Sequence, residues 1–395
     1  MTFPRRKKII LLGMMSKMPV AGVIWQTMHY LIGFRRLGYD VYYVEAHART
    51  PGMLMTSPTD DGSGHAAAFI DRVMRRFGME GKWAYQAFHD DGRCYGMSDT
   101  ALAQLFKEAE LVINLHGGTK PRPEHYARGR LVYLETDPVT LQIELHERQQ
   151  ASIDFLAPHF IFFTFGENYG RPGCGLPVST QFKFLPTRQP VILDFWRPFR
   201  NGTAEAFTTI GNYKQEWREV AFNGEIYHWS KHHEFLKIID LPGRTAQAFE
   251  LGLGNCDAEE KKNLETHGWR IRGADEFSAD ADQYRRYITA SRGEFTVAKD
   301  QNVRLRSGWF SDRSATYLAS GLPVITQDTA FDAALPTGRG LFAFSNLDQA
   351  VAAVESINGD YEGNRRAAEE IAREYFAHDK VLGPMLEACG MDGSG

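Results

Sequence analysis

The segment that most constrains the fold of this chain is residues 304–328, which combines a turn, a helix and a strand. Ser311 and Asp312 carry short side-chain oxygens that can accept hydrogen bonds from the free N–H groups of a first helical turn. Gly321 is the expected left-handed residue at the end of this helix. Residues 323–326 form a short apolar run that is typical of a buried strand. The segment therefore predicts a helix that leads directly into a strand, as in α/β proteins.

The start of this helix is suited to binding an anion. A helix N-terminus presents several free N–H groups and the positive end of the helix dipole, which together favour phosphate. Ser307 and Gly308 leave room before the helix, and Arg306 and Arg313 on its two sides supply charge-assisted donors. The alternative is a half-buried turn in which the serines only cap the helix.

The motif G-W-x-S that begins at Gly308, followed by A-x-G-x-P-V-I from Ala319, resembles the donor-binding box of glycosyltransferases with the GT-B architecture. In that family a small-residue turn and the next helix hold the diphosphate of a nucleotide sugar. Two departures stand out. The spacing between the Gly-Trp pair and the Gly-x-Pro is longer than in the plant-type box, and Arg306 stands near the position of the His that precedes the turn in that box. In addition, Thr316 stands at about the position of the helix acid with which many bacterial members bind the ribose. The donor site that we expect consists of Lys214, Arg306, Ser307, Gly308, Ser311, Asp312, Arg313 and Asp328.

Length and composition limit the class of protein. With 395 residues the chain is long enough for two domains of ordinary size. Its hydrophobic fraction of 43% and charged fraction of 24% are typical of a soluble globular protein. A net charge of −4 provides no basic surface for nucleic acid. The four cysteines include no C-x-x-C pair, which favours a reducing compartment and disfavours zinc or a disulfide framework.

The N-terminus has two interpretations. Basic residues 5–8 precede an apolar run over residues 9–15, as in a signal peptide. The run is short, Ser16 and Lys17 interrupt it, and no small-residue cleavage site follows. We therefore expect a first buried strand and no integral membrane segment, since no stretch approaches the ~20 apolar residues that span a bilayer. The expected location is cytoplasmic.

The first half of the chain alternates apolar strands with amphipathic helices, which predicts a Rossmann-like domain. It lacks G-x-G-x-x-G, so dinucleotide binding is disfavoured. Residues 50–64 are rich in Pro, Gly, Ser, Thr and Asp, and we expect a mobile loop on the acceptor side of the site. The predicted strands are residues 9–13, 40–45, 111–115, 130–135 and 160–165.

Polar residues follow three of these strands, where the carboxyl ends of a parallel sheet form a cleft wall. His116 precedes two glycines that allow a ligand to approach the backbone, and many retaining GT-B members place a His at a comparable strand end. Asp137 and Glu167 end the next two strands, although Asp137 before Pro138 is also a good N-cap and Glu167 is equally explained by solvation. We take His116 and Asp137 as the catalytic candidates, acting on acceptor or sugar.

The second half repeats the alternation after a proline-containing link over residues 185–196. A strand over residues 207–210 leads to Lys214, where the first loop of a second Rossmann-like domain faces the cleft. The predicted organisation is an acceptor-side domain over residues 1–190, a nucleotide-sugar-binding domain over residues 191–360, and residues 361–395 with a terminal helix that crosses back, as in GT-B enzymes.

One histidine cluster has residue types that can bind a metal ion. His228 and His232 are one helical turn apart, and His233 and Glu234 adjoin them. A spacing of four can present two imidazoles to zinc. No matching carboxylate motif accompanies the cluster, and Trp229 indicates packing, so we expect a structural role and no bound metal.

These observations predict an α/β, GT-B-like protein with two Rossmann-like domains that face a cleft. We expect a metal-independent glycosyltransferase that moves a sugar from a nucleotide-diphosphate sugar to a small-molecule or glycan acceptor, with no other cofactor. The alternatives are a nucleotide-sugar epimerase on the same scaffold and a catalytically silent nucleotide-sugar-binding protein. The sequence does not identify the sugar, the nucleotide, the acceptor, the stereochemical outcome or the oligomeric state.

Overall fold

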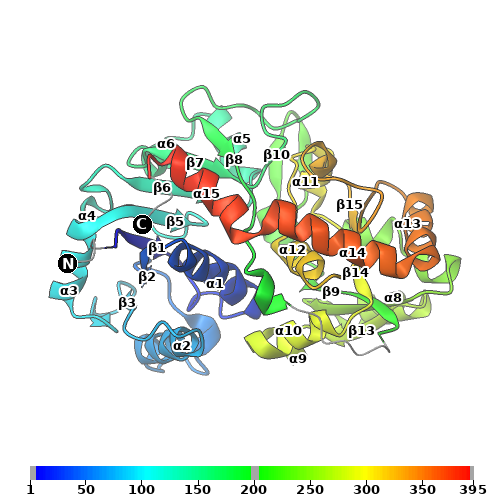
Figure 1. Ribbon diagram of the computed structural model, residues 1–395, viewed down its shortest axis with the longest axis horizontal. Helices are drawn as coiled ribbons and strands as arrows, with labels where there is room; N and C mark the ends of the chain where they lie inside the picture. Colours follow the sequence, from blue (N-terminus) through cyan, green and yellow to red (C-terminus); the bar gives the residue numbers. More distant parts are fainter. Residues whose placement is uncertain (1–5, 197–203, 392–395) are drawn as a thin grey trace.

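The computed structural model describes residues 6–196 and 204–391, and two largely parallel sheets flanked by helices make up an α/β protein (Figure 1). The predicted fold class is confirmed. Basic residue Arg5 and the last four residues of the predicted terminal segment lie outside the described residues. Within the described ranges, no helix has the length and apolar character needed to cross a bilayer.

The strands of the first sheet are, in chain order, β1 (Lys8–Leu12), β2 (Asp40–Glu45), β3 (Trp83–Gln86), β4 (Cys94–Tyr95), β5 (Ala109–Leu115), β6 (Leu131–Glu135), β7 (Ile161–Thr164) and β8 (Phe184–Pro186). Their order is β4-β3-β2-β1-β5-β6-β7-β8, and only β3 and β4 pair antiparallel. The helical segments of this half are α1 (Ala21–Arg36), η1 (Gly52–Leu54), α2 (Gly62–Arg76), α3 (Asp99–Glu108), α4 (Pro123–Tyr126), α5 (Thr140–His146) and α6 (Gln150–Leu156). Strand β2 pairs with β1 on one side and β5 pairs with it on the other, so the strand order reverses at β1. Such a reversal opens a crevice at the carboxyl ends of these strands.

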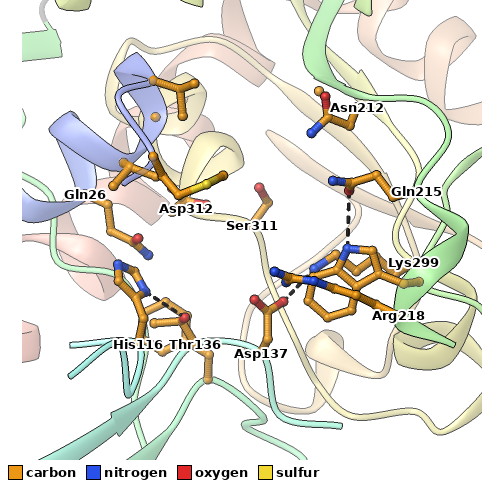
Figure 2. Close-up of a pocket in the computed structure, with 18 of the residues that line it drawn as sticks. Gln26, His116, Thr136, Asp137, Asn212, Gln215, Arg218, Lys299, Ser311 and Asp312 are labelled. Carbon is orange, nitrogen blue, oxygen red and sulfur yellow. Dashed lines mark hydrogen bonds and ion pairs between the residues drawn. The ribbon is translucent and has the colours of Figure 1, made fainter. Parts of the chain in front are cut away.

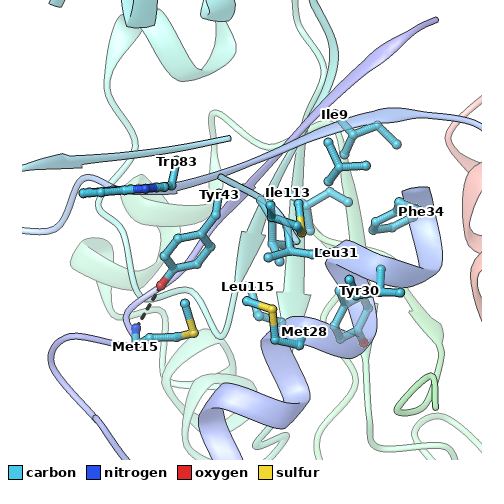
Figure 3. Close-up of a cluster of buried hydrophobic side chains, with 14 of the residues drawn as sticks. Ile9, Met15, Met28, Tyr30, Leu31, Phe34, Tyr43, Trp83, Ile113 and Leu115 are labelled. Carbon is cyan, nitrogen blue, oxygen red and sulfur yellow. Dashed lines mark hydrogen bonds between the residues drawn. The ribbon is translucent and has the colours of Figure 1, made fainter. Parts of the chain in front are cut away.

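Strand β1 lies at the centre because both of its faces are apolar. Ile9 and Leu11 pack into the cluster that α1 covers, part of which Figure 3 shows. Ile10 and Leu12 pack with α3 on the opposite face. Alternate side chains of a strand point to opposite faces, so an unbroken apolar run needs cover on both. Helix α1 is buried nearly all round because it also contacts the second half, where Trp25 Nε1 donates to the carbonyl of Ala281 at 2.8 Å.

The strands of the second sheet are β9 (Ala206–Asn212), β12 (Ala248–Gly254), β13 (Arg270–Gly273), β14 (Gly293–Thr296), β15 (Val324–Gln327) and β16 (Leu341–Phe344). They are parallel, and β9 lies between β12 and β14, which makes a second crevice at its carboxyl end. The longer helices of this half are α8 (Ala258–Thr266), α10 (Ala281–Thr289), α12 (Asp312–Ala319) and α13 (Leu347–Gly359). Shorter segments are η2 (Leu193–Trp196), η3 (Glu216–Arg218), α7 (His232–Leu236), η4 (Leu241–Arg244), α9 (Asp275–Ser278), α11 (Asp300–Arg304) and η5 (Phe331–Ala333).

The C-terminal helices connect the two halves. Helix α14 (Tyr361–Ile371) continues into a π-helical segment, η6 (Ala372–Phe376), and both pack on α12. Helix α15 (His378–Ala388) then places Leu382 and Leu386 in the core of the first half, beside α1. Figure 1 shows these helices, in orange to red, running across both halves of the molecule.

The sequence predicted most strands and long helices, but it missed β3, β4 and several short helices. Three further features that it missed have a local explanation. Edge strand β8 occupies part of the expected link, and its Pro186 is tolerated because an edge strand leaves N–H groups unpaired. A small antiparallel hairpin, β10 (Val220–Phe222) and β11 (Glu225–Tyr227), follows β9, although its Asn223-Gly224 turn is a recognisable hairpin signal. Helix α15 was missed because Pro384 lies inside it.

Candidate active site

A cavity of about 1010 Å³ lies between the two sheets, at the carboxyl ends of their central strands. Residues after β1, β5 and β6 line its first-domain wall, and residues after β9 and β14 together with the start of α12 line the opposite wall. Figure 2 shows that side chains from both walls point into this space. In open α/β sheets this is the place where ligands bind.

His116 lies at the carboxyl end of β5 with its backbone in the left-handed region, at a φ of 62°. Its Nδ1 is 2.9 Å from Thr136 Oγ1, whereas its Nε2 is buried and has no hydrogen-bond partner within the described protein. Burial lowers the pKa of His116 to about 4, against an opposing effect of Asp137. The imidazole is therefore neutral near pH 7, and it belongs to a residue of the cavity lining with one nitrogen that has no partner among the described residues.

Asp137 connects the two walls. Its carboxylate pairs with Lys299 Nζ at 2.6 Å, and Lys299 lies just after β14 in the second half. The same ammonium lies 3.1 Å from the ring centroid of Trp229. Asp137 is not the N-cap of the following helix, because α5 begins at Thr140 with Val139 in the N-cap position. The sequence did not single out Lys299, although it follows a strand end by the same rule that identified His116.

Lys231 is the second cavity residue that the sequence did not identify. It precedes α7, directly after the β10–β11 hairpin, and its ammonium makes no hydrogen bond or ion pair within the described part of the chain. Surrounding protein atoms and the nearby cations Arg313 and Lys299 lower the pKa of Lys231 well below its usual range. Arg218 also lines the cavity, with its guanidinium 4.8 Å from the centroid of the Trp229 ring. The second wall thus carries several basic side chains, and among the described residues Lys231 forms no ion pair.

The structure brings together some of the predicted site residues and separates others. Those that line the cavity are His116, Asp137, Ser311, Asp312 and Arg313. Those that lie outside its lining are Lys214, Arg306, Ser307, Gly308 and Asp328. Residues 50–64, predicted as a loop throughout, contain η1 and the first turn of α2, and they also lie outside the lining, which includes Arg49.

The turn before α12 packs against protein. Gly308 has a φ of 77°, and a Cβ there would lie 2.3 Å from the backbone nitrogen of Asn168, in the first half. The Asn168 N–H donates to the carbonyl of Ser307 at 3.1 Å, and the Ser307 hydroxyl donates to Asn302 at 2.8 Å. The small residues that suggested room for a ligand therefore allow the close approach of Asn168.

Two predicted cations have acidic partners away from the cavity. Arg306 contacts Asp328 at 3.3 Å, and Lys214 contacts Glu260 at 3.5 Å. The Arg306 side chain is 49% exposed. Both pairs are near the surface, where such contacts contribute about 0–1 kcal/mol to stability. Their role in donor binding stays a prediction.

The start of α12 already holds a negative group. Ser311 occupies the N-cap position without a side-chain capping hydrogen bond, and the Asp312 carboxyl accepts from the N–H groups of Asp312 and Arg313. Burial raises the pKa of Asp312, and Arg313 opposes this effect. A phosphate directly at this helix end would meet the Asp312 carboxyl, which makes the neighbouring cations the better-placed partners.

Arg313 is held mainly by the protein. Its guanidinium donates to Glu294 at 2.6 Å, to the carbonyl of Ile210 at 2.5 Å and to Thr296 at 2.9 Å. The Glu294 side chain is 0% exposed, so Arg313 is the cation that compensates a fully buried carboxylate. Part of Arg313 still faces the cavity.

We expect Arg313→Ala to lower the free energy of unfolding by about 3–5 kcal/mol, because it leaves the buried Glu294 carboxylate unpaired. Arg306→Ala is the matched control, and it should change the free energy by less than about 1 kcal/mol. Urea denaturation of both variants measures the difference. Wild-type stability in Arg313→Ala would contradict the assigned pairing.

Glu135, at the end of β6, is a buried carboxyl group in the cavity wall. Burial raises the pKa of Glu135 to about 8, against hydrogen bonds from Thr164 and Gln142 that favour the charged form. Because the pKa of Glu135 is higher in the folded than in the unfolded chain, its contribution to stability is fully present at pH values below the unfolded-state pKa. This contribution is lost as the pH rises toward about 8.

We expect the neutral variant Glu135→Gln to match the wild type near pH 5 and to be more stable by on the order of 3 kcal/mol at pH 9. Urea denaturation across this pH range measures the difference. Two parallel stability profiles would show that Glu135 does not titrate abnormally.

The histidine cluster does not have the predicted helical geometry. His228 precedes α7, which begins at His232, so the two rings are not one turn apart on a helix. His228 Nδ1 lies 2.5 Å from Glu219, and His232 Nδ1 lies 2.6 Å from the Ser230 hydroxyl. Among the described residues, no group of three His, Cys, Asp or Glu side chains is arranged to hold a metal ion.

The arrangement of two facing Rossmann-like sheets with a crossing C-terminal helix is the GT-B architecture. Sucrose-phosphate synthase from Thermosynechococcus elongatus has a TM-score of 0.55 at 11% identity, covering 97% of this chain and 98% of that chain. HepE of Anabaena in complex with UDP-glucose has a TM-score of 0.56 at 11% identity, covering 97% and 99%. The pneumococcal O-GlcNAc transferase GtfA with UDP and GlcNAc has a TM-score of 0.52 at 9% identity, covering 98% and 99%.

These solved structures are glycosyltransferases, and at such identities the similarity establishes the fold alone. The sequence matches no family model, and no curated protein is significantly similar to it.

Proposed function

We propose that this protein is a glycosyltransferase that moves a sugar from a nucleoside-diphosphate sugar to an acceptor bound in the same cavity. The observation that carries this proposal is the asymmetry of the cavity. One wall holds Lys231, a buried basic side chain that forms no ion pair among the described residues, and the other holds His116, whose Nε2 has no hydrogen-bond partner there. An anion bound beside Lys231 on the second wall places the rest of a nucleotide sugar within the cavity that His116 also lines.

The cations of the second wall would bind the diphosphate. Lys231 supplies a point charge that an incoming dianion would keep protonated, and Arg218 supplies a planar fork suited to phosphate oxygens. Lys299 adds positive charge nearby, although Asp137 already partners it. During transfer, negative charge grows on the departing diphosphate, and fixed cations in a shielded cavity stabilise it without a metal ion.

His116 would act on the reacting sugar or on the acceptor hydroxyl. A neutral imidazole can donate or accept through Nε2, depending on whether Thr136 accepts from Nδ1 or donates to it. Asp137 lies close enough to influence the charge of His116 and is tied to Lys299. Asp137 would therefore couple the binding of an anion beside Lys299 to the protonation of the His116 imidazole.

UDP is a reasonable first probe, because HepE and GtfA contain it in their solved complexes. If the cations bind a diphosphate, UDP should raise the melting temperature whereas uridine should not. Saturation at ~100 Kd corresponds to about 2.7 kcal/mol of added stability. Equal shifts from uridine and UDP would contradict the diphosphate site.

Turnover of UDP-sugars separates the proposed transferase from its alternatives. A transferase releases UDP faster when an acceptor is present, an epimerase changes the donor without an acceptor, and a silent binding protein does neither. Activity should survive EDTA, because the proposed site stabilises the leaving group with side-chain cations. Loss of activity on chelation, followed by recovery with a divalent ion, would overturn the metal-independent mechanism.

A further inference from the structure

Two further cations line the first-domain wall of the cavity, Lys17 in the loop after β1 and Arg49 in the loop after β2. The loops that carry them lie side by side, because Lys17 Nζ donates to the carbonyl of Thr50, the residue after Arg49, at 3.3 Å. Among the described residues, neither side chain forms an ion pair. Two cations on neighbouring loops of one cavity wall, neither of them in an ion pair among the described residues, favour an anionic ligand.

A buried carboxylate fixes the two loops that carry these cations. The Glu45 side chain is 0% exposed and accepts hydrogen bonds from the N–H of Ser16 at 2.8 Å and from the Ser16 hydroxyl. It also contacts His47 Nε2 at 2.9 Å, and His47 Nδ1 accepts from the N–H of Arg49 at 3.2 Å.

The Tyr43 hydroxyl strengthens this network. It donates to Glu45 at 2.6 Å and accepts from the N–H of Met15 at 2.9 Å, a contact that Figure 3 shows. The backbone positions next to Lys17 and at Arg49 are therefore set by the same buried group. A network in which every member is satisfied holds its loops rigidly, so the backbone that carries the two cations is preorganised.

The acids on this wall are engaged elsewhere. Asp137 pairs with Lys299, the Glu144 carboxylate accepts from the Ser152 hydroxyl at 2.6 Å, and Glu135 lies buried against Thr164 and Gln142. The first wall thus has two cations available for a ligand and no described acid that neutralises them.

We infer that Lys17 and Arg49 form a subsite for an acceptor that carries a phosphate or carboxylate group. This inference rests on the proposed function, since it takes the second wall as the donor side. An Arg fork and a Lys point charge suit such an oxyanion, which would orient the acceptor hydroxyl toward the donor. The anion belongs either to a soluble sugar derivative or to a lipid headgroup.

Titration calorimetry of the full chain saturated with UDP tests the subsite, with glucose 6-phosphate and glucuronate compared against glucose. We expect at least one anionic sugar to bind about tenfold more tightly than glucose, equivalent to about 1.4 kcal/mol. Lys17→Ala and Arg49→Ala should each remove much of this preference, and the double variant should remove it all. The control is Lys107→Ala, which changes an exposed lysine on α3 outside the cavity lining. This variant should keep the preference for anionic sugars.

A vesicle arm identifies the source of the anion. Co-sedimentation compares vesicles of phosphatidylcholine with vesicles that also contain phosphatidic acid. Binding to the acidic vesicles that requires Lys17 and Arg49 assigns the anion to a lipid, and binding of the sugars alone assigns it to a soluble acceptor. If the wild type prefers neither the anionic sugars nor the acidic vesicles, or the double variant behaves as wild type, the inference is overturned.

The two proposals fail in distinguishable ways. A protein that does not bind UDP contradicts the proposed function, and titration of the sugars without UDP then still reports on Lys17 and Arg49. A protein that binds UDP through Lys231 but lacks the anionic preference retains the proposed function and loses only the acceptor subsite.

Discussion

Lys231→Ala should weaken UDP binding by at least 30-fold, since removal of a shielded cation that contacts phosphate costs about 2–5 kcal/mol. The same substitution should leave the stability of the nucleotide-free protein unchanged or slightly higher. The reason is that Lys231 is surrounded by protein and lies near two other cations, which lower its pKa. A loss of affinity without a loss of stability is the signature of a residue kept for its ligand.

The pH dependence of UDP binding follows from the same residue. Because the pKa of Lys231 is lowered in the free protein and a bound dianion raises it, UDP binding should take up protons. The affinity for UDP should therefore fall as the pH rises through the lowered pKa of Lys231. This pH dependence should disappear in Lys231→Ala. Calorimetry in buffers of different ionisation enthalpy measures the proton uptake. Lys262→Ala, on the exposed face of α8, is the control; equal UDP affinity in both variants would remove Lys231 from the site.

His116→Asn should reduce turnover of the donor by about 10²-fold or more, within the range of 10²–10⁴ for a positioned acid or base. Asn is chosen because it tolerates the left-handed backbone at this position, so the fold should be retained. UDP affinity should stay within about threefold of the wild type, because the proposed site places the diphosphate at the opposite wall from the imidazole.

Thr136→Val tests how His116 is held. It removes the hydroxyl at Nδ1 and should give a smaller loss of turnover, together with a changed pH profile, since the imidazole then loses its orienting partner. Steady-state kinetics across pH measures both effects. Full activity in His116→Asn would assign the histidine to the fold, and a loss of UDP binding would move it to the donor subsite.

The parts of the fold that were predictable from the sequence depend on local signals. The apolar run at Ile9 identified a strand buried on both faces, and Gly321 ended α12 in the left-handed conformation with a φ of 64°. His116 was recognisable because a strand and two glycines flank it. Each of these signals lies within a few residues of the feature that it predicts.

The rest of the site depends on contacts between distant segments. The turn at Ser307 and Gly308 has the composition of a ligand loop, but Asn168 from the other half fills it. Arg313 has the position of a residue that donates hydrogen bonds to a diphosphate, but the neighbouring strand β14 provides Glu294 as its partner. Lys231 belongs to neither a strand end nor the motif, and only the path of the chain after the β10–β11 hairpin brings it to the cavity.

The most direct test of the central claim is a crystal structure of the protein with UDP. The diphosphate should lie in the cavity between the sheets, with its oxygens within hydrogen-bonding distance, about 3 Å, of Lys231 Nζ and the Arg218 guanidinium. UDP bound at the Arg306–Gly308 turn, or a cavity that stays empty at saturating UDP, would contradict the account.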